Sequence, residues 1–160
     1  MPQNTIIRRF NDDDLPSVYE LVQNTIDFSY RPDYPEKVIE FFKEYHTRES
    51  ILDDAKNGYT IVALQDGEIA GTGTLLGANI RRVFISPLYQ RRGIGTLIAD
   101  ELEKKAAADN QSILDLSSAL GSRTFWESRG FIIQEELFAP AGKDRIIHYY
   151  SMIKTLDGIV

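Results

Sequence analysis

The sequence contains no cysteine and only two histidines, His46 and His148. The absence of cysteine excludes disulfides, thiolate metal ligands and a thiol nucleophile. Two histidines far apart in the sequence do not make the cluster that a histidine-based metal site needs. We therefore expect a protein without a metal, whose chemistry uses neither a thiol nor a metal ion.

Long hydrophobic runs and a basic surplus are missing too. No stretch approaches the length of a membrane span, and the first residues, MPQNTIIRRF, carry no apolar signal core. We expect a cytoplasmic protein with no membrane partner. A net charge of −6 and a pI near 4.9 argue against a nucleic-acid partner, because nucleic-acid binders normally present a basic face. With 160 residues, 42% of them hydrophobic, the chain is expected to form a single domain over 1–160.

Hydrophobic periodicity and turn residues predict eleven elements in the order β, α, α, β, β, β, α, β, α, β, β. Asp66-Gly67 and the segment 140–144 are typical of hairpin loops. Consecutive hairpins combined with strand–helix–strand crossings predict an α/β (α+β) fold, with a mixed, mostly antiparallel sheet of about seven strands flanked by helices. The predicted strands cover 5–10, 59–64, 69–76, 82–85, 112–117, 131–138 and 145–153, and the predicted helices about 15–22, 38–45, 94–106 and 123–128.

The segment Gln90-Arg91-Arg92-Gly93-Ile94-Gly95 stands at the start of the third predicted helix. The first amides of a helix have no internal acceptor and lie at its positive dipole end, and the two glycines leave room for a bulky anion. Between 81 and 92 there are four arginines and no acid. These features favour a phosphate or pyrophosphate site, although a glycine turn with solvated arginines would look the same. A dinucleotide fingerprint is excluded by Ile98, and a P-loop by the lack of Gly-Lys-Ser/Thr.

This segment resembles the coenzyme A loop of the GCN5-related N-acetyltransferases (GNAT), Gln/Arg-x-x-Gly-x-Gly/Ala, at every fixed position. The surrounding pieces are similar as well: a strand "RRVFISP" before the loop, a strand "SILDLSS" after the helix, and "FWESRGF", which resembles the family's Phe-Tyr-x-x-x-Gly-Phe junction. The resemblance implies the acyl-CoA N-acyltransferase fold and acetyl-CoA (coenzyme A) as co-substrate. It further implies direct acetyl transfer to a primary amine of a small molecule or peptide, and a possible homodimer.

The resemblance also implies positions for the cofactor. The strand over 83–85 corresponds to the one whose backbone bonds the pantetheine arm, and the loop over 91–96 to the one whose amides surround the pyrophosphate. Ser118 stands near the position of a family asparagine that touches the pantetheine, and Phe125 and Trp126 correspond to the Phe-Tyr pair of the junction. The implied cofactor-binding residues are Val83, Phe84, Ile85, Gln90, Arg91, Arg92, Gly93, Ile94, Gly95, Thr96, Ser118, Phe125 and Trp126.

The sequence departs from the family in two places that concern mechanism. Trp126 stands where many members have the tyrosine that protonates the departing thiolate, and an indole cannot supply that proton. Ala119 stands where many have an asparagine, although Ser117 and Ser118 could replace part of its contacts. A non-catalytic acyl-CoA-binding or regulatory module of the same fold is therefore the alternative.

The sequence does not assign a catalytic base. The strand before the loop offers no glutamate, so the frequent family base is missing there. His46, Asp115 and Tyr149 or Tyr150 are candidates, but a structural or surface role is the more ordinary explanation of each.

The acceptor is expected to bind at the segment DFSYRPDYP, 27–35, which is predicted to be a loop. It combines acids with three aromatic residues, Phe28, Tyr30 and Tyr34, and so offers both parts of a site for a small amine. The same rings could instead pack the loop onto the core.

Overall fold

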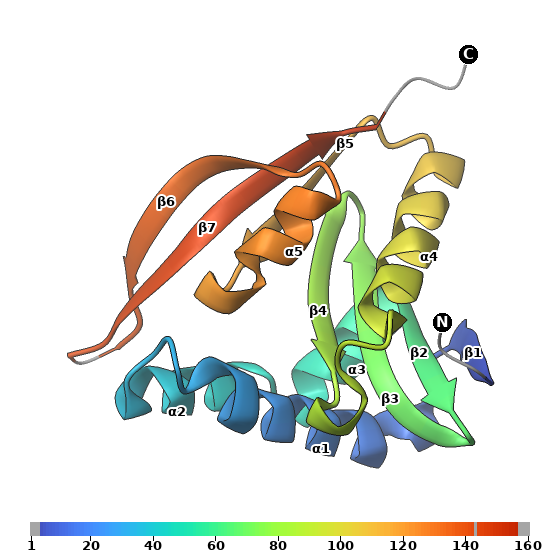
Figure 1. Ribbon diagram of the computed structural model, residues 1–160, viewed down its shortest axis with the longest axis horizontal. Coiled ribbons are helices and arrows are strands. Elements are labelled where there is room, and N and C mark those ends of the chain that lie inside the picture. Colours follow the sequence, from blue (N-terminus) through green and yellow to red (C-terminus); the bar gives the residue numbers. More distant parts are fainter. Residues whose placement is uncertain (1–3, 143, 157–160) are drawn as a thin grey trace.

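The computed structural model describes residues 4–142 and 144–156, which form a seven-stranded sheet with helices on both faces (Figure 1). The ends of the predicted domain, 1–3 and 157–160, and Lys143 in the predicted hairpin loop lie outside the described residues. The strands are β1 (Thr5–Arg9), β2 (Tyr59–Gln65), β3 (Glu68–Leu76), β4 (Asn79–Ile85), β5 (Ile113–Ser118), β6 (Ile132–Pro140) and β7 (Ile146–Thr155).

In space the strands follow the order β1-β2-β3-β4-β5-β7-β6. Neighbouring strands are antiparallel, except that β4 and β5 run parallel. The helices are α1 (Leu15–Thr25), α2 (Glu36–Tyr45), α3 (Arg48–Asn57), α4 (Ile94–Ala108) and α5 (Arg123–Ser128), and the short helical turns are η1 (Asp12–Asp14), η2 (Ile26–Tyr30), η3 (Pro87–Tyr89) and η4 (Leu120–Ser122). The predicted mixed, mostly antiparallel sheet flanked by helices is confirmed.

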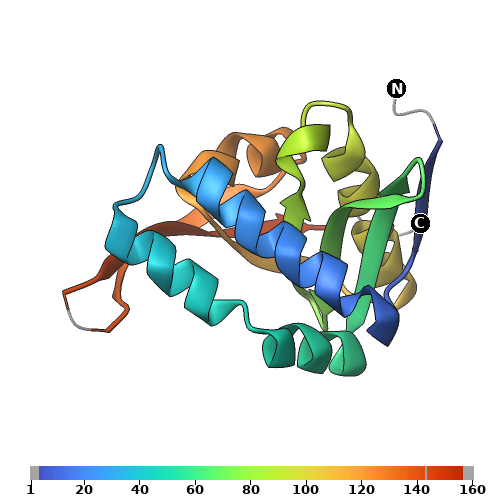
Figure 2. The ribbon, with the colours of Figure 1, turned by 90° about the horizontal axis from the view of Figure 1, so that it is seen from below.

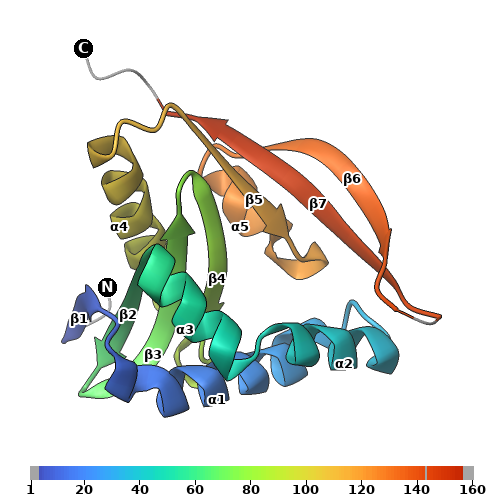
Figure 3. The same ribbon diagram turned by 180° about the vertical axis from the view of Figure 1, so that it is seen from behind.

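The helices divide between the two faces of the sheet. α1 contacts β3 and β4 and α3 contacts β2 and β3, whereas α4 packs on β2, β3 and β4 from the opposite face. Figure 2 shows α1, α2 and α3 on one side of the sheet and α4 on the other, and Figure 3 shows α3 in front of the strands. No helix among the described residues has both the length and the apolar character needed to cross a membrane.

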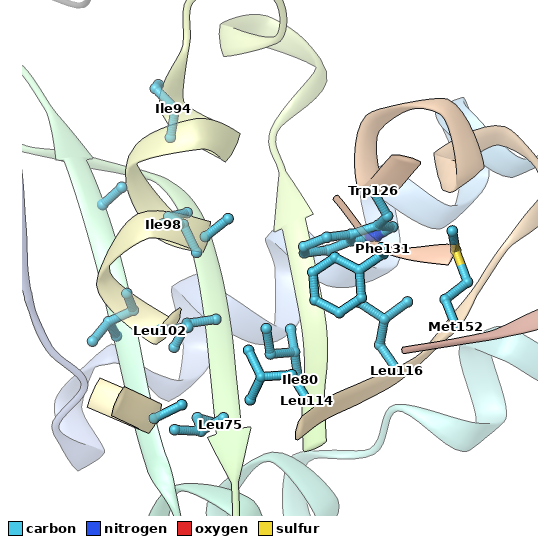
Figure 4. Packing of buried hydrophobic residues seen from close by; sticks show 14 of the residues in the cluster. Leu75, Ile80, Ile94, Ile98, Leu102, Leu114, Leu116, Trp126, Phe131 and Met152 are labelled. Carbon is cyan, nitrogen blue, oxygen red and sulfur yellow. The ribbon is translucent and has the colours of Figure 1, made fainter. Parts of the chain in front are cut away.

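Each face has its own hydrophobic core. Under α4, the side chains of Ile94, Ile98 and Leu102 are almost fully buried against the sheet, and Trp126 and Phe131 extend this core toward β5 and β7 (Figure 4). The core on the other face joins α1 and α2 to β2, β4 and β7, and its residues include Val18, Val22, Ile26, Val62, Phe84 and Ile147.

Glycines in β3 allow α4 to lie close to the sheet. A Cβ added at Gly71 would lie 2.9 Å from Ile98 Cδ1, and one added at Gly73 would lie 2.6 Å from Ile98 Cγ2. Both distances are shorter than any real side-chain contact, so the helix occupies the space that side chains at 71 and 73 would fill. This packing fixes where the N-terminus of α4 lies relative to β4.

Three elements differ from those expected. Helix α3 was not predicted, although Thr47 Oγ1 accepts the amide hydrogen of Ser50 at 3.0 Å as its N-cap, and Gly58 ends it. Strand β4 begins at Asn79 rather than at 82, because it pairs with β3 from its first residue. The segment 27–35 is not wholly a loop, since η2 continues α1 as a π-helical turn.

We expect Gly73→Ala to lower the free energy of unfolding by about 1–3 kcal/mol, the usual cost of overpacking a core. The methyl group would collide with Ile98 and Leu102 and push α4 off β3. Chemical denaturation followed by circular dichroism measures the change. Gly95→Ala is the control: its Cβ would lie 3.5 Å from the Phe125 ring, an ordinary contact, and alanine favours the helix. Equal destabilisation by both substitutions would contradict this account.

Candidate active site

Strands β4 and β5 separate almost as soon as they meet. Their ladder contains the single pair Asn79 and Asp115, supported by the amide of Asp115, which donates to the carbonyl of Ala78 at 3.0 Å. Beyond this point the two strands diverge, and Figure 1 shows β4 leaving β5 toward the start of α4. Facing strands that no longer pair leave main-chain donors and acceptors along both edges. The opening therefore offers hydrogen-bonding groups in the middle of a sheet.

A β-bulge lies in β4 next to this opening. Thr72 pairs with Phe84 and Thr74 with Arg81, so Arg82 and Val83 both lie opposite Gly73. Arg82 adopts φ 54°, the left-handed conformation that one position of a bulge often requires. Because the extra residue interrupts the alternation of the strand, Arg81 and Arg82 both reach Asp54 on α3.

A cavity of about 410 Å³ fills the opening and continues under α2. Its lining combines the two separated strands with the aromatic residues of η2, α2 and β7. The residues from the strands, η4 and α5 are Asn79, Ile80, Arg81, Arg82, Val83, Phe84, Leu116, Ser117, Ser118, Ala119, Ser122 and Trp126, and those under α2 and along β6 and β7 are Tyr30, Phe41, Phe42, Tyr45, His46, Ala139, Pro140, Ile147 and Tyr149.

His46, Arg82 and Asp54 form a buried hydrogen-bond network at the wall of the cavity. Arg82 Nη1 lies 2.6 Å from His46 Nδ1, and Arg82 Nε donates to Asp54 Oδ2 at 3.1 Å. An arginine can only donate, so Nδ1 accepts and the imidazole proton lies on Nε2. Burial, followed by the charge of Arg82, lowers the pKa of His46 to about 3. His46 is thus neutral with its basic nitrogen already occupied, which disfavours it as a general base.

The N-terminus of α4 lies beyond the carboxyl end of β4. Gly93 caps the helix with φ 82°, and the first intrahelical bond runs from the amide of Leu97 to the carbonyl of Gly93 at 3.1 Å. The amides of 94–96 therefore have no intrahelical acceptor. The side chains of Arg91 and Arg92 next to them are exposed. This end of the helix can accept an anion.

Gln90 and Gly95 shape the loop around that helix start. The Gln90 side chain donates to the carbonyl of Ile85 at 3.0 Å and to the Ser29 hydroxyl at 3.1 Å, which fixes the loop to the end of β4 and to η2. The Phe125 ring of α5 lies beside Gly95 of α4, 3.5 Å from the position that a Cβ there would occupy. Gln90 thus holds the loop in place, and Gly95 brings the loop next to Phe125, another of the residues implied for the cofactor.

The structure brings together most of the residues implied for the cofactor. Val83, Phe84, Ser118 and Trp126 line the cavity, while Ile85 and the loop residues lie between its β4 wall and α4. Trp126 is 5% exposed, with its ring edge-on to Phe125 and Phe131 at 4.8 and 5.4 Å between centroids.

The three aromatic residues that were expected to bind the acceptor lie in three different surroundings. Tyr30 lines the cavity, whereas Phe28 is exposed outside it. The hydroxyl of Tyr34 donates to the carbonyl of His148 at 2.6 Å and accepts the amide hydrogen of Leu120 at 3.1 Å. It joins η4 to β7 and does not line the cavity.

Two of the base candidates also lie away from the cavity. Asp115 accepts a hydrogen bond from the Asn79 side chain where β4 and β5 meet, and the Tyr150 hydroxyl accepts from Arg123. Tyr149 does line the cavity, on the same face of the sheet as α1 and α2.

Sequence reasoning missed the arginine pair and its partner. Arg81 and Arg82 were noted only as part of a basic stretch, and Asp54 lay in a helix that was not predicted. The available signal was Thr47 as an N-cap, the apolar pair Ile51 and Leu52, and Gly58 at the end, which together would have indicated α3.

Solved structures share this fold. The chain is similar to the GCN5-related N-acetyltransferase from Rhodopseudomonas palustris, with 21% identity over 98% of each chain and a TM-score of 0.90. It is also similar to the PaiA N-acetyltransferase from Thermoplasma acidophilum in complex with coenzyme A, at 19% identity over 96% of this chain and 100% of that one, with a TM-score of 0.79. The ribosomal-protein-S18-alanine N-acetyltransferase from Escherichia coli aligns over 98% of this chain and 96% of its own, with 16% identity and a TM-score of 0.73. No curated protein matches the chain significantly.

Residues 30–156 match the family model described as "Acetyltransferase (GNAT) domain". Because the match spans most of the sequence, the chain belongs to the GNAT acetyltransferases, and it is an acyltransferase enzyme. The family predicted from the loop at 90–95 is confirmed.

The buried His46 predicts a specific loss of stability in acid. In the unfolded chain its pKa is about 6.5, so below that pH the unfolded state binds a proton that the folded state refuses. Between pH 7 and pH 5 this costs about 2 kcal/mol, provided that the folded pKa stays well below 5. Urea denaturation of the wild type and of His46→Gln at both pH values measures it. We expect the glutamine variant to lose less stability by about this amount, and parallel losses would contradict the assignment.

Proposed function

We propose that this enzyme transfers the acetyl group of acetyl-CoA directly to a primary amine of a small molecule or peptide, in the cytoplasm. The observation that carries the proposal is the separation of β4 and β5, which opens a cavity whose β4 wall leads to the free amides at the start of α4. Within the GNAT family this arrangement offers one continuous path for an acyl-CoA.

The path suits the two chemically different parts of coenzyme A. The pantetheine arm contains amides, and the unpaired edge of β4 over 83–85 offers main-chain groups that can hydrogen-bond them, apart from the Ile85 carbonyl that already accepts from Gln90. The pyrophosphate is anionic, and the amides of 94–96 with the positive end of the helix dipole favour such a charge. Arg91 and Arg92 add positive charge beside them.

A direct transfer fits the side chains at the cavity. The chain has no cysteine for a thiol-linked acyl-enzyme, and His46 does not have a free basic nitrogen to activate a serine. In a direct transfer the amine nitrogen forms the new C–N bond to the thioester carbon, and the C–S bond breaks. The amine must first lose the proton that it carries near neutral pH, and the thiolate must then gain one.

Tyr149 is our candidate for moving a proton at this site. It lines the cavity, and among the described residues its hydroxyl forms no hydrogen bond, so the hydroxyl is available to a substrate. Trp126 lines the same cavity but carries no group that can exchange a proton at ordinary pH. Tyr149 would thus supply the proton-exchanging group that Trp126 lacks.

The acceptor remains open between a small molecule and a peptide. The Escherichia coli relative is named for an alanine of a ribosomal protein, so a peptide acceptor is one proposal for this chain. A homodimer stays a prediction, with β6 as the outer strand of the sheet that a second copy could meet.

We expect Arg91→Ser combined with Arg92→Ser to weaken acetyl-CoA binding, because both charges lie beside the free amides of α4. Titration calorimetry at several salt concentrations should show an affinity lower by roughly 3–30-fold and a shallower dependence on salt, since screening acts on such exposed charges. Identical salt dependence in the double variant and the wild type would mean that these arginines are merely solvated.

The function is tested by thiol release from acetyl-CoA over a panel of primary amines, with calorimetry for acetyl-CoA binding. We expect turnover, and we expect Tyr149→Phe to lower kcat by about 10²-fold or more at nearly unchanged KM, as loss of a general acid or base does. Trp126→Phe is the comparison and should affect stability more than kcat. Tight binding of acetyl-CoA without turnover on any amine would instead support a non-catalytic acyl-CoA-binding or regulatory module.

A further inference from the structure

The charges at the cavity are unequal. Its lining contains two arginines, Arg81 and Arg82, and no aspartate or glutamate. The carboxylate of Asp54 contacts both guanidinium groups from α3 and balances one of the two positive charges. One positive charge is left facing the cavity.

Arg82 keeps one guanidinium nitrogen free for a ligand. Its Nε donates to Asp54 and its Nη1 to His46, while Nη2 makes no hydrogen bond to any described residue. The Arg82 side chain is 8% exposed, yet no fully buried side-chain nitrogen or oxygen in the described part of the chain lacks a partner. Because Arg82 lines the cavity, we infer that Nη2 faces the cavity space.

Arg81 provides a second free nitrogen nearby. Its Nε donates to Asn79 Oδ1 at 2.7 Å and its Nη1 lies 3.4 Å from Asp54 Oδ2, which leaves Nη2 without a partner among the described residues. Two guanidinium groups are therefore held in place by neighbouring side chains, each with a donor to spare. Ordering them beforehand reduces the entropy cost of binding an anion.

The remaining walls on this face are mainly aromatic and apolar. Tyr30, Phe42 and Tyr45 from η2 and α2 line the cavity, with the Tyr45 ring near the Arg82 guanidinium, and Ile147 and Tyr149 of β7 line it as well. A ligand that fits here needs an apolar body as well as a negative group.

We propose that the amine acceptor carries a carboxylate, bound by Arg81 and Arg82, and an aromatic or large apolar side chain that lies between α2 and β7. This deepens the proposed function and rests on it. An amino acid with such a side chain is the chemical class that has the amine, the carboxylate and the apolar body in one small molecule. Cationic diamines are disfavoured, because the cavity presents positive charge and no carboxylate.

Position and charge separate this anion site from the coenzyme. Arg81 and Arg82 contact α3, on the face of the sheet opposite α4, whose amides would take the pyrophosphate. The single excess positive charge matches one carboxylate better than a doubly charged phosphate. Val83, next to Arg82, lines the same cavity, so a short acceptor held by the arginines presents its amine at the open edge of β4.

The first arm of the test measures binding without catalysis. N-acetyl-phenylalanine and N-acetyl-2-phenylethylamine share the acetylated nitrogen and the ring and differ in the carboxylate. By calorimetry we expect the first to bind the wild type roughly 10–100-fold more tightly, the usual value of a charge-assisted pair. Equal affinities would overturn the carboxylate site even if the enzyme acetylates amines.

The second arm measures turnover. Phenylalanine, phenylalaninamide and 2-phenylethylamine are compared as acceptors with the wild type, Arg82→Gln and Arg81→Gln. We expect the ratio of the KM for phenylalanine to the KM for 2-phenylethylamine to rise roughly 10–100-fold in either variant. Arg48→Gln is the matched control, because Arg48 lies over the Tyr19 ring away from the cavity and should leave all three acceptors unchanged.

The outcomes distinguish the two levels of the proposal. Turnover of 2-phenylethylamine as efficient as that of phenylalanine overturns the carboxylate site and leaves the transferase intact. Absence of turnover on every amine overturns the proposed function, and the binding arm then still decides whether the arginines hold a carboxylate. If Arg82→Gln does not fold because Asp54 and His46 lose their contact with Arg82, Arg81→Gln decides the test, since the Arg81 side chain is 36% exposed in the wild type.

Discussion

The single backbone pair between β4 and β5 is the constraint on which the rest of the site depends. Parallel neighbours in a sheet normally continue their ladder, and here it stops after Asn79 and Asp115. The strands can separate because each is held on its other side, β4 by β3 and β5 by β7. Their open edges and the space between them then become available to ligands instead of to each other.

A second constraint is the fixed position of α4 above this opening. Gly71 and Gly73 let the helix approach β3, and the loop from Ile85 to Gly93 then leads its N-terminus to the end of β4. The bulge opposite Gly73 acts on the other face, where it directs Arg82 toward Asp54 and His46. The same part of β3 and β4 therefore packs against α4 on one face and positions the hydrogen-bond network of His46, Arg82 and Asp54 on the other.

The sequence predicts the parts of this arrangement that depend on neighbours along the chain. The Gly-x-Gly at 93–95, the hairpin at Asp66-Gly67 and the apolar stripe of α4 are local signals, and the structure contains all three elements. The bulge in β4 cannot be predicted from local sequence. Glycine or asparagine usually occupies a position with a positive φ, so an arginine with φ 54° gives no indication of a bulge.

The hydrogen-bond network of His46, Arg82 and Asp54 could not be predicted from the sequence for a related reason. Its members come from α3, from the residue that follows α2, and from β4, so the contacts exist only once the helices lie on the sheet. Helix α3 was missed because charged residues outnumber its apolar ones, and its buried face is short. Tyr34 shows the same limit, because an aromatic residue in a polar segment indicates a ligand contact as readily as the internal hydrogen bonds that it makes.

The two hydrogen bonds of the Tyr34 hydroxyl connect parts of the fold that the sheet itself joins weakly. With one ladder pair between them, strands β1–β4 and strands β5–β7 form two parts of the sheet whose backbones pair only at Asn79 and Asp115. The Tyr34 hydroxyl lies in the segment between η2 and α2 and makes hydrogen bonds to both η4 and β7. It therefore connects the helices next to β1–β4 with the β5–β7 part of the sheet. Together with the two hydrophobic cores, this phenol therefore holds the β5–β7 part of the sheet beside the helices at the end of the opening that lies away from Asn79 and Asp115.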